Sequence, residues 1–386
     1  MIKGFKVRLY PTKEQERLFW KHIGSCRFLW NYMIDWQKKR YEDGEKYASA
    51  FTMNKHLTEL KNDGEHGWLY EVSNSSLQTT CRDLDKTYKE FFKKKKGYPK
   101  FKSRKTDRPS FPINVTSFYF KDDKTCNIQK IGKVRYKTNT EFPIGNKCKF
   151  TNPRVSYEPA RKKWILSFGM ELQNEAQELT DNLMGVDLGI KELAVVANGD
   201  EELYFHNINK SKRIRTLEKK KRHIQENISR KYESSRKNNG GKYVKTNGII
   251  REEQKLREVQ ARINGIRENY THQVTNALVK KLPKRITVED LNVSGMMKNK
   301  HLSKAVQEQR FFEVLRQIEY KCEWNGIEFV KADRFYPSSK TCSRCGHKKD
   351  DLKLSDRVYV CPECGLEIDR DFNAALNLQK YVAPNK

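Results

Sequence analysis

Four cysteines near the end of the chain have the spacing of a zinc site. They form two Cys-x-x-Cys pairs, Cys342 with Cys345 and Cys361 with Cys364, with 15 residues between the pairs and a glycine directly after each pair. Each pair can present two thiolates from one tight turn, and four thiolates complete a tetrahedral zinc site. The spacing therefore predicts one structural Zn²⁺ bound by all four cysteines, with no open position for catalysis.

Three acidic residues lie in predicted strands or at the start of a predicted helix, and together they could form a second metal site. Asp187 interrupts an apolar run at 183–190, Glu289 ends another at 285–289, and Asp371 lies at the start of a helix of small residues. A carboxylate among apolar residues is costly to bury unless it is paired or binds a metal ion. Three such carboxylates could hold two Mg²⁺ (or Mn²⁺) ions and hydrolyse a phosphodiester. Taken singly, each acid could instead be a cap at a strand end, and Asp-x-Gly on a strand also occurs in sugar kinases.

The charge balance indicates a polyanionic partner. The 386 residues include 78 Lys and Arg against 49 Asp and Glu, which gives a net charge of +29. Lys and Arg bind nucleic acid by neutralising phosphates, and an aromatic content of 11% is too high for a disordered basic tail. The alternatives are a ribosomal-type protein or one that binds a membrane surface. No apolar run approaches the roughly 20 residues of a membrane span, and residues 1–10 lack the apolar core of a signal peptide.

Five further cysteines show no regular spacing. The total of nine is odd, which argues against a disulfide framework and for a reducing, cytoplasmic compartment. We expect these five to be small core residues: Cys26, Cys81, Cys126, Cys148 and Cys322.

The first half of the chain changes from a helical to a strand pattern. Residues 5–10 alternate as a strand does, and a capping box that begins at Thr12 predicts the start of a helix over 13–40. A second helix is expected over about 74–95, with one apolar and one basic face. Short strands and turns from 110 to 178 favour a small β-barrel or sandwich.

The second half alternates strands and helices from 180 to 380, which is an α/β pattern. Within it, 193–197 is expected to form a hairpin with the strand that carries Asp187. Residues 208–245 hold 14 Lys and Arg against 3 acidic residues, which favours a charged helix pair or a mobile basic arm.

Candidate contacts with nucleic acid come from basic segments. Residues 93–105 interleave basic and aromatic side chains, which suits the backbone and bases of a single strand. On the basic face of helix 74–95, the Gln78 amide could pair with both hydrogen-bonding groups of an adenine edge. The predicted contacts are Gln78, Arg82, Lys100, Arg104 and Arg334.

Taken together, these motifs resemble the TnpB (OrfB) family of insertion-sequence proteins, which are relatives of compact type V CRISPR effectors. The most specific match is the run Tyr-Pro-Ser-Ser-Lys-Thr-Cys-Ser-x-Cys-Gly at 336–346, and the likeness extends over nearly the whole chain. The other matching segments are 6–12, 185–190, 288–291, 361–364 and 369–375.

The resemblance implies an RNase H-like (RuvC) nuclease core with Asp187, Glu289 and Asp371 as catalytic metal ligands. It selects Asp371 over Asp369, because the third acid of the family belongs to an Asp-x-Asn pattern, which Asn373 completes here. Some relatives have lost these acids and act as RNA-guided repressors, whereas this chain retains all three.

The resemblance also implies an α+β multidomain fold with a helical recognition lobe, a small wedge β-barrel and a nuclease domain with an inserted zinc ribbon. The expected domains are a first wedge strand at 1–10, a helical recognition domain at 11–109, the rest of the wedge barrel at 110–179, the nuclease at 180–336, the zinc ribbon at 337–367, and the third acid with the C-terminus at 368–386.

By the same resemblance, the expected function is that of an RNA-guided DNA endonuclease. Such a protein binds a transposon-derived guide RNA as a monomer, recognises a short motif beside its target and cuts double-stranded DNA. Base pairing reads the long target, so the protein need hold only the heteroduplex backbone and read a few base pairs. The expected location is the bacterial or archaeal cytoplasm, at the nucleoid when bound to DNA, with no membrane partner. The alternatives are a compact type V CRISPR effector, a transposase that acts without RNA, and a non-catalytic zinc-ribbon regulator.

Overall fold

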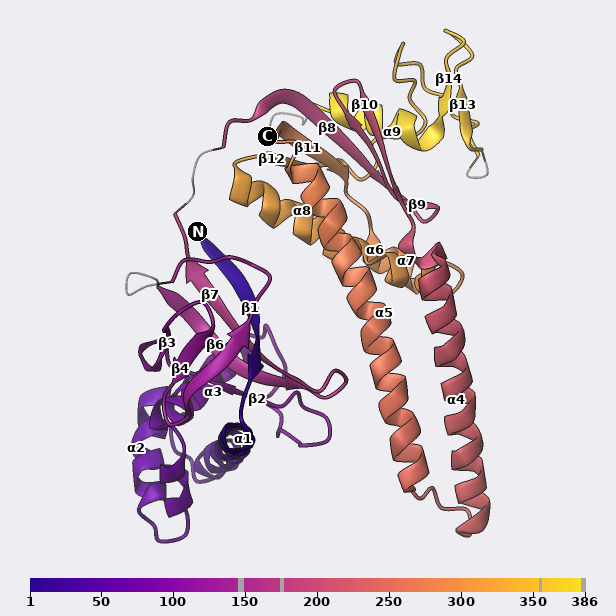
Figure 1. The fold of residues 1–386 in the computed structure, drawn as a ribbon. Coiled ribbons are helices and arrows are strands. Elements are labelled where there is room, and N and C mark those ends of the chain that lie inside the picture. Colours follow the sequence, from indigo (N-terminus) through magenta and orange to yellow (C-terminus); the bar gives the residue numbers. More distant parts are fainter. Residues whose placement is uncertain (145–148, 174–176, 354–355, 383–386) are drawn as a thin grey trace. The chain divides into compact units, whose positions relative to one another are not determined.

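The computed structural model describes residues 1–144, 149–173, 177–353 and 356–382. The chain divides into two compact units, Met1–Gln173 and Asn174–Lys386 (Figure 1). Both units combine helices with sheets, which confirms an α+β chain with several sheets. Among the described residues, no helix has the length and apolarity needed to cross a membrane.

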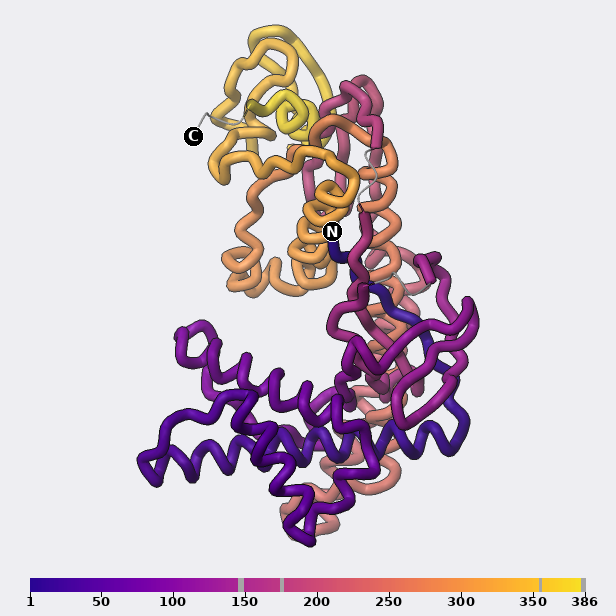
Figure 2. The backbone as a smooth tube through the Cα atoms, turned by 90° about the vertical axis from the view of Figure 1, so that its left-hand side faces the viewer, coloured from indigo at the N-terminus to yellow at the C-terminus, as the bar shows by residue number. Residues whose placement is uncertain are grey.

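Three helices form the helical part of the first unit: α1 (Lys13–Glu42), α2 (Ala50–Lys61) and α3 (Asn74–Phe92). The predicted capping box starts α1, because the Thr12 hydroxyl accepts a hydrogen bond from the Gln15 amide and the Gln15 side chain accepts one from the Thr12 amide. α1 and α3 lie side by side (Figure 2). The sequence did not predict α2, and α3 ends at Phe92 rather than at 95, shortly before Lys94 adopts a φ of 55°.

The strands of the first unit form one antiparallel sheet in the order β2-β6-β7-β1-β5-β4-β3. These strands are β1 (Ile2–Tyr10), β2 (Ser110–Pro112), β3 (Phe118–Phe120), β4 (Thr125–Ile128), β5 (Gly132–Lys137), β6 (Phe150–Glu158) and β7 (Lys163–Glu171). The N-terminal strand lies in the middle of the sheet, between β5 and β7. Within the described residues β2 and β3 do not pair with each other, so closure into a barrel stays a prediction.

The second unit contains a five-stranded sheet in the order β10-β9-β8-β11-β12. β8 (Thr180–Leu188), β9 (Glu192–Asn198) and β10 (Glu201–His206) form an antiparallel meander, which includes the predicted hairpin. β11 (Pro283–Glu289) is parallel to β8, and β12 (Glu328–Ala332) is parallel to β11. One apolar core joins this sheet to α5 (Asn247–Val279) and α8 (Phe311–Asn325).

A long helical hairpin consists of α4 (Lys212–Asn238) and α5. The two helices meet through a small apolar cluster of Ile224, Val259 and Ile263. The expectation for 208–245 was therefore wrong in detail, because this region forms one ordered helix whose partner follows it in the chain. The remaining elements are α6 (Val293–Lys298), α7 (Ser303–Gln309), β13 (Val358–Val360), β14 (Glu367–Asp369) and α9 (Arg370–Lys380).

Candidate functional site

Two of the three predicted acids lie in the same row of the five-stranded sheet. β8 and β11 are parallel, and their register pairs Val186 with Val288, so Asp187 and Glu289 are the next residues on neighbouring strands. Both valines are buried in the core against α5 and α8. Side chains alternate along a strand, so both carboxylates belong to the opposite face of the sheet.

The third acid reaches this face because α9 packs directly on β8 (Figure 1). A Cβ atom on Gly185 would lie 2.0 Å from the carbonyl oxygen of Ala375 and 2.4 Å from the amide nitrogen of Gln379. Gly185 faces the same side of β8 as Asp187, so the glycine lets the helix backbone touch the strand. The first turn of α9, which carries Asp371, is thereby brought toward the other two carboxylates.

Asp369 and Asp371 have different roles in this helix. The Asp369 carboxylate caps α9 by accepting hydrogen bonds from the backbone amides of Asp371 and Phe372, at 2.9 and 3.0 Å. Asp371 instead pairs with its neighbour Arg370, whose Nη2 lies 3.0 Å from Oδ1 of the carboxylate. Both side chains of this ion pair are mostly buried. Arg370 is therefore a cation within the acidic site. The spacing of residues in the sequence did not predict this role.

Crowded negative charge raises the pKa of two of the carboxyl groups. For Asp187, burial raises the pKa well above its usual value, repulsion from Glu289 and Asp371 adds to this effect, and Arg370 opposes it. For Glu289, burial again raises the pKa, the Ser338 hydroxyl opposes it by donating a hydrogen bond, and Asp371 raises it further. A bound divalent cation would reverse these effects, because it stabilises the ionised carboxylates.

The donor set suits a hard divalent cation. Carboxylate oxygens from three separate elements are ligands that Mg²⁺ and Mn²⁺ prefer. Within the described part of the chain, only the ribbon cysteines place three or more ligand atoms all within 4.8 Å of one another. The three acids thus share one face and interact electrostatically, but their oxygens are not gathered as tightly as those sulfurs.

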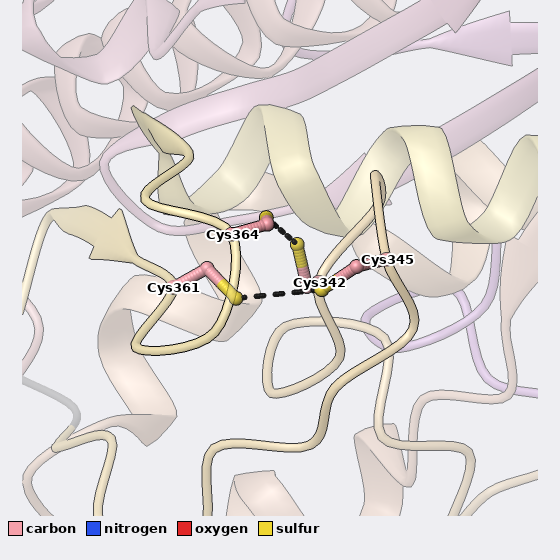
Figure 3. A group of neighbouring side chains, drawn as sticks. All are labelled: Cys342, Cys345, Cys361 and Cys364. Carbon is pink, nitrogen blue, oxygen red and sulfur yellow. Dashed lines mark hydrogen bonds between the residues drawn. The ribbon is translucent and has the colours of Figure 1, made fainter.

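The four predicted zinc ligands converge (Figure 3). The Sγ atoms of Cys342 and Cys364 are 3.6 Å apart, and those of Cys345 and Cys361 are 3.5 Å apart. Zinc–sulfur bonds of about 2.3 Å at tetrahedral angles separate the sulfurs by about 3.8 Å. The glycine after each pair has a positive φ, 76° and 67°, which permits the tight turn. The cluster can therefore hold one structural Zn²⁺, as the spacing predicted.

The other cysteines are separate from this cluster. Cys26, Cys81, Cys126 and Cys322 are buried free thiols, as expected for small core residues. Burial raises the pKa of Cys81 to about 12, so this thiol stays protonated and unreactive. Cys148 lies outside the described residues.

Two buried asparagines of α9 hold the first cysteine pair in place. Asn373 donates to the Thr341 carbonyl at 2.7 Å and accepts from the Ser343 amide at 2.9 Å. One turn further along, Asn377 donates to the same Thr341 carbonyl at 2.6 Å. The sequence singled out Asn373 as part of the Asp-x-Asn pattern. It gave no indication of a role for Asn377.

Ser338 connects these contacts to the acidic site. Its carbonyl accepts a hydrogen bond from the Asn377 side chain at 2.7 Å, and its hydroxyl donates to the Glu289 carboxylate. Ser338 belongs to the run 336–346 that carries the family resemblance, but the resemblance did not predict this contact. The ribbon, α9 and β11 are thus joined around the acids.

The predicted nucleic-acid contacts are divided between the two units. Four of them are in the first unit: Gln78, Arg82, Lys100 and Arg104. Gln78 is partly buried, and the other three are exposed. In the second unit, Arg334 pairs with Asp290 at 2.7 Å and lines a hollow of about 250 Å³ beside Glu289.

Comparison with known proteins supports the family resemblance. Three family models match separate parts of the chain: the OrfB helix-turn-helix domain at 1–46, the IS605 OrfB model described as "Probable transposase" at 166–300, and the TNB domain of Cas12f1-like proteins at 311–378. A Streptomyces pristinaespiralis protein assigned as an RNA-guided DNA endonuclease is 29% identical over 97% of this chain and 88% of its own length. The chain is similar to the TnpB (OrfB) family over nearly its whole length.

One further relative and two solved structures are also similar over nearly the whole chain. InsQ of Escherichia coli K12, also assigned as an RNA-guided DNA endonuclease, is 28% identical over 98% of this chain and 91% of its own length. The cryo-EM structure of a Cas12f1–sgRNA–target DNA complex matches with a TM-score of 0.54 over 98% of both chains, at 14% identity. The mini-RNA-guided endonuclease CRISPR-Cas_phi3 matches with a TM-score of 0.50 over 98% of this chain and 92% of its own, at 10% identity. At these identities the likeness to the solved structures is one of fold.

Proposed function

We propose that this chain is an RNA-guided DNA endonuclease of an insertion sequence, with Asp187, Glu289 and Asp371 as its catalytic residues. One observation carries the proposal: three mutually repelling carboxylates come from β8, β11 and α9 in a chain of net charge +29. Relatives assigned as RNA-guided DNA endonucleases align over nearly the whole chain, which supports the same activity here.

The order and direction of the strands support a RuvC-type, RNase H-like domain. An antiparallel meander is followed by two parallel strands, in the order β10-β9-β8-β11-β12. The central strand delivers Asp187 and its parallel neighbour delivers Glu289. We assign the nuclease to 180–336, the zinc ribbon to 337–367, the third acid to 368–386, helical recognition to 11–109, and the wedge to 1–10 with 110–179.

The chain's own residues position the ligands for catalysis. Two Mg²⁺ (or Mn²⁺) ions held by the three carboxylates would activate the attacking water and stabilise the leaving oxygen of the phosphodiester. The Ser338 hydroxyl orients Glu289, and the close contact at Gly185 seats α9 on β8. Because burial and repulsion raise the pKa of Asp187 and Glu289, protons compete with cations for this site as the pH falls.

Dependence on RNA tests this function. Protein purified at high salt with nuclease treatment is expected not to cut duplex DNA, and to regain sequence-specific cleavage when the RNA that copurifies with it is restored. Pairing with the guide supplies the reading of sequence, and a bound polyanion relieves the self-repulsion of a +29 chain. The bound RNA should be a discrete species of roughly 100 nucleotides or more, which sequencing would identify.

Three results would contradict the proposal in different ways. Sequence-specific double-strand cleavage by the RNA-free protein would indicate a transposase. RNA-dependent binding without cleavage would indicate a guided regulator. A guide encoded in a CRISPR array, in place of a transposon end, would indicate a compact CRISPR effector with the same chemistry.

Replacing Gly185 with alanine is expected to push α9 away from β8. The added Cβ would meet backbone atoms of Ala375 and Gln379, which cannot move aside as a flexible side chain can. The free energy of unfolding should fall by about 3 kcal/mol or more. Cleavage should fall roughly a hundredfold, because a misplacement of about 1 Å can cost that much. Thermal unfolding and cleavage assays measure the two effects.

Gly4→Ala is the matched control, because a Cβ at Gly4 would meet no atom within 4 Å. It lies in a strand of the first unit and should change neither stability nor cleavage appreciably. Native stability and native cleavage in the Gly185→Ala protein would show that α9 does not need this close contact.

A further inference from the structure

A basic hollow lies within the first unit, and neither the three acids nor the ribbon cysteines line it. Its volume is about 300 Å³, and it is bounded by α1, α3, β6 and the segment 102–112. Five basic side chains line it: Arg27, Lys102, Arg104, Arg108 and Arg154. Two acidic residues, Asp83 and Asp107, also line it, so the basic side chains outnumber the acidic ones.

The acidic side chains of the hollow are already engaged. Asp83 pairs with Arg154 at 2.6 Å. Asp107 accepts hydrogen bonds from the Ser103 amide and the Thr106 hydroxyl, within its own turn. Arg108 pairs with Glu158, outside the hollow, at 3.5 Å. The remaining basic side chains of the hollow therefore find no free carboxylate there.

Three basic side chains of the hollow make no close ion pair with a carboxylate among the described residues. Within the described part of the chain, neither Arg27 nor Arg104 has a carboxylate within ion-pair distance. The Lys102 ammonium lies over the Trp30 ring, 3.4 Å from its centre, and has no acidic partner among the described residues. Their positive charge is thus available to an anion from outside the chain.

The position of Lys102 is fixed by the backbone. Its amide donates to the Asn31 side chain at 2.7 Å, and the Asn31 amide group donates back to the Lys102 carbonyl at 2.9 Å. Burial and then repulsion from Arg154 lower the pKa of Lys102 to about 8, although Asp83 and Asp107 oppose this shift. A cation held where its charge is disfavoured gains from a nearby anion, which would restore its pKa toward the ordinary value.

We propose that this hollow binds a single backbone phosphate of a nucleic-acid strand. The proposal rests on the proposed function, because that function supplies the nucleic acid. Guanidinium groups suit phosphate oxygens, since they can donate two parallel hydrogen bonds to them. The volume of about 300 Å³ suits one phosphodiester group better than a whole duplex. Arg27 and Arg104 bind the phosphate oxygens, and Lys102 adds a third positive charge to the lining of the hollow.

The test removes two of the unpaired cations together. Arg27→Gln/Arg104→Gln keeps both side chains polar and changes the charge by two. Lys121→Gln/Lys124→Gln is the matched control, because these exposed lysines lie in the turn between β3 and β4, outside the hollow. Equal melting temperatures for both double variants and the native protein would establish that the hollow variant is folded.

Fluorescence anisotropy measures binding in two arms over a range of salt concentrations. One arm uses a labelled mixed-sequence single-stranded RNA, and the other uses a DNA duplex of the same sequence. Arg27→Gln/Arg104→Gln should bind at least one probe roughly tenfold more weakly, with a salt slope lower by about one, and the control should lie within about twofold of the native protein. Loss in only the RNA arm or only the DNA arm identifies which strand supplies the phosphate.

The proposal is overturned if the hollow variant binds both probes like the control. That result would be distinct from a failure of the proposed function, because native protein would still bind nucleic acid. Native protein that binds neither probe would contradict the proposed function itself. An equal loss in the hollow variant and the control would also overturn the proposal, because it would indicate a diffuse charge effect.

Discussion

Replacing Asp187 with asparagine is expected to abolish DNA cleavage while RNA and DNA binding persist. Asparagine has nearly the same size as aspartate but lacks its charge, so the change removes a metal ligand and leaves the strand intact. Interactions between a metal ion and the transition state contribute several kcal/mol, and each 1.36 kcal/mol is a factor of ten in rate. The expected loss is therefore about a thousandfold or more.

The location of Asp187 makes this effect specific to catalysis. Its carboxylate lies on the face opposite the apolar core, and burial with repulsion from Glu289 and Asp371 raises its pKa. Removing one of several crowded charges relieves repulsion, so folding stability should not fall. Cleavage of a labelled duplex by RNA-loaded protein, with binding measured in parallel, separates the two effects.

Asp181→Asn is the control for Asp187→Asn. Asp181 is an exposed acid near the start of the same strand, β8, so it reports the general effect of losing a negative charge there. It should leave cleavage unchanged. If Asp187→Asn cleaves at a near-native rate, Asp187 is not a catalytic metal ligand, and the proposed metal site is wrong.

Removing the zinc site is expected to disrupt both the ribbon and the catalytic acids. The four thiolates are the main source of the ribbon's folding energy, since metal binding and folding are coupled in such small sites. Cys342→Ala should therefore lower the zinc content well below one ion per chain and disorder the ribbon. Asn373 and Asn377 would then lose their partner at Thr341, and Ser338 would no longer orient Glu289. Cleavage should fall roughly a hundredfold or more.

Two variants separate zinc binding from its consequence for the acids. Cys322→Ala removes a buried thiol of α8 in the same unit and should keep the full zinc content and cleavage. Asn373→Ala should also keep the zinc, but it should reduce cleavage because one of the two asparagine links from α9 to the ribbon is lost, while Asn377 remains. Elemental analysis and cleavage assays test both, and active protein that contains no zinc would contradict the structural role of the ribbon.

Much of the local structure was predictable because the responsible interactions are local. The strand predicted at 5–10 lies within β1, and α1 starts at Lys13 after the capping box, as the pattern predicted. α2 was missed because its signal is weak. It is 12 residues long, no side chain caps its start, and Phe51 is 70% exposed on it.

The helix α4 was predicted less well because it has few apolar residues among many charged ones. Of its 27 residues, only Ile214, Ile224 and Ser235 are buried. Such a sparse stripe resembles that of a solvated arm, and the helix is stabilised by α5, which lies beyond the basic region. Tertiary contact of this kind has no signature within the segment itself.

The candidate site also has a part that the sequence could predict and a part that depends on tertiary contacts. Acids within apolar strands and paired cysteines are visible in the sequence, so Asp187, Glu289 and the four cysteines could be selected. The parallel register that sets Asp187 beside Glu289, and the link from Ser338 to Asn377, exist only after folding. The ion pair between Arg334 and Asp290 was invisible for the same reason.

The most direct measurement is cleavage by one protein preparation loaded with either of two RNAs that differ only in the guide segment. Two DNA duplexes are offered together, each matching one guide and carrying the same flanking motif. In Mg²⁺, each RNA should direct cutting of its own duplex only, and chelation of the metal ion should stop both reactions. Cutting that ignores the guide, continues without RNA or needs no divalent metal ion would contradict an RNA-guided, metal-dependent endonuclease.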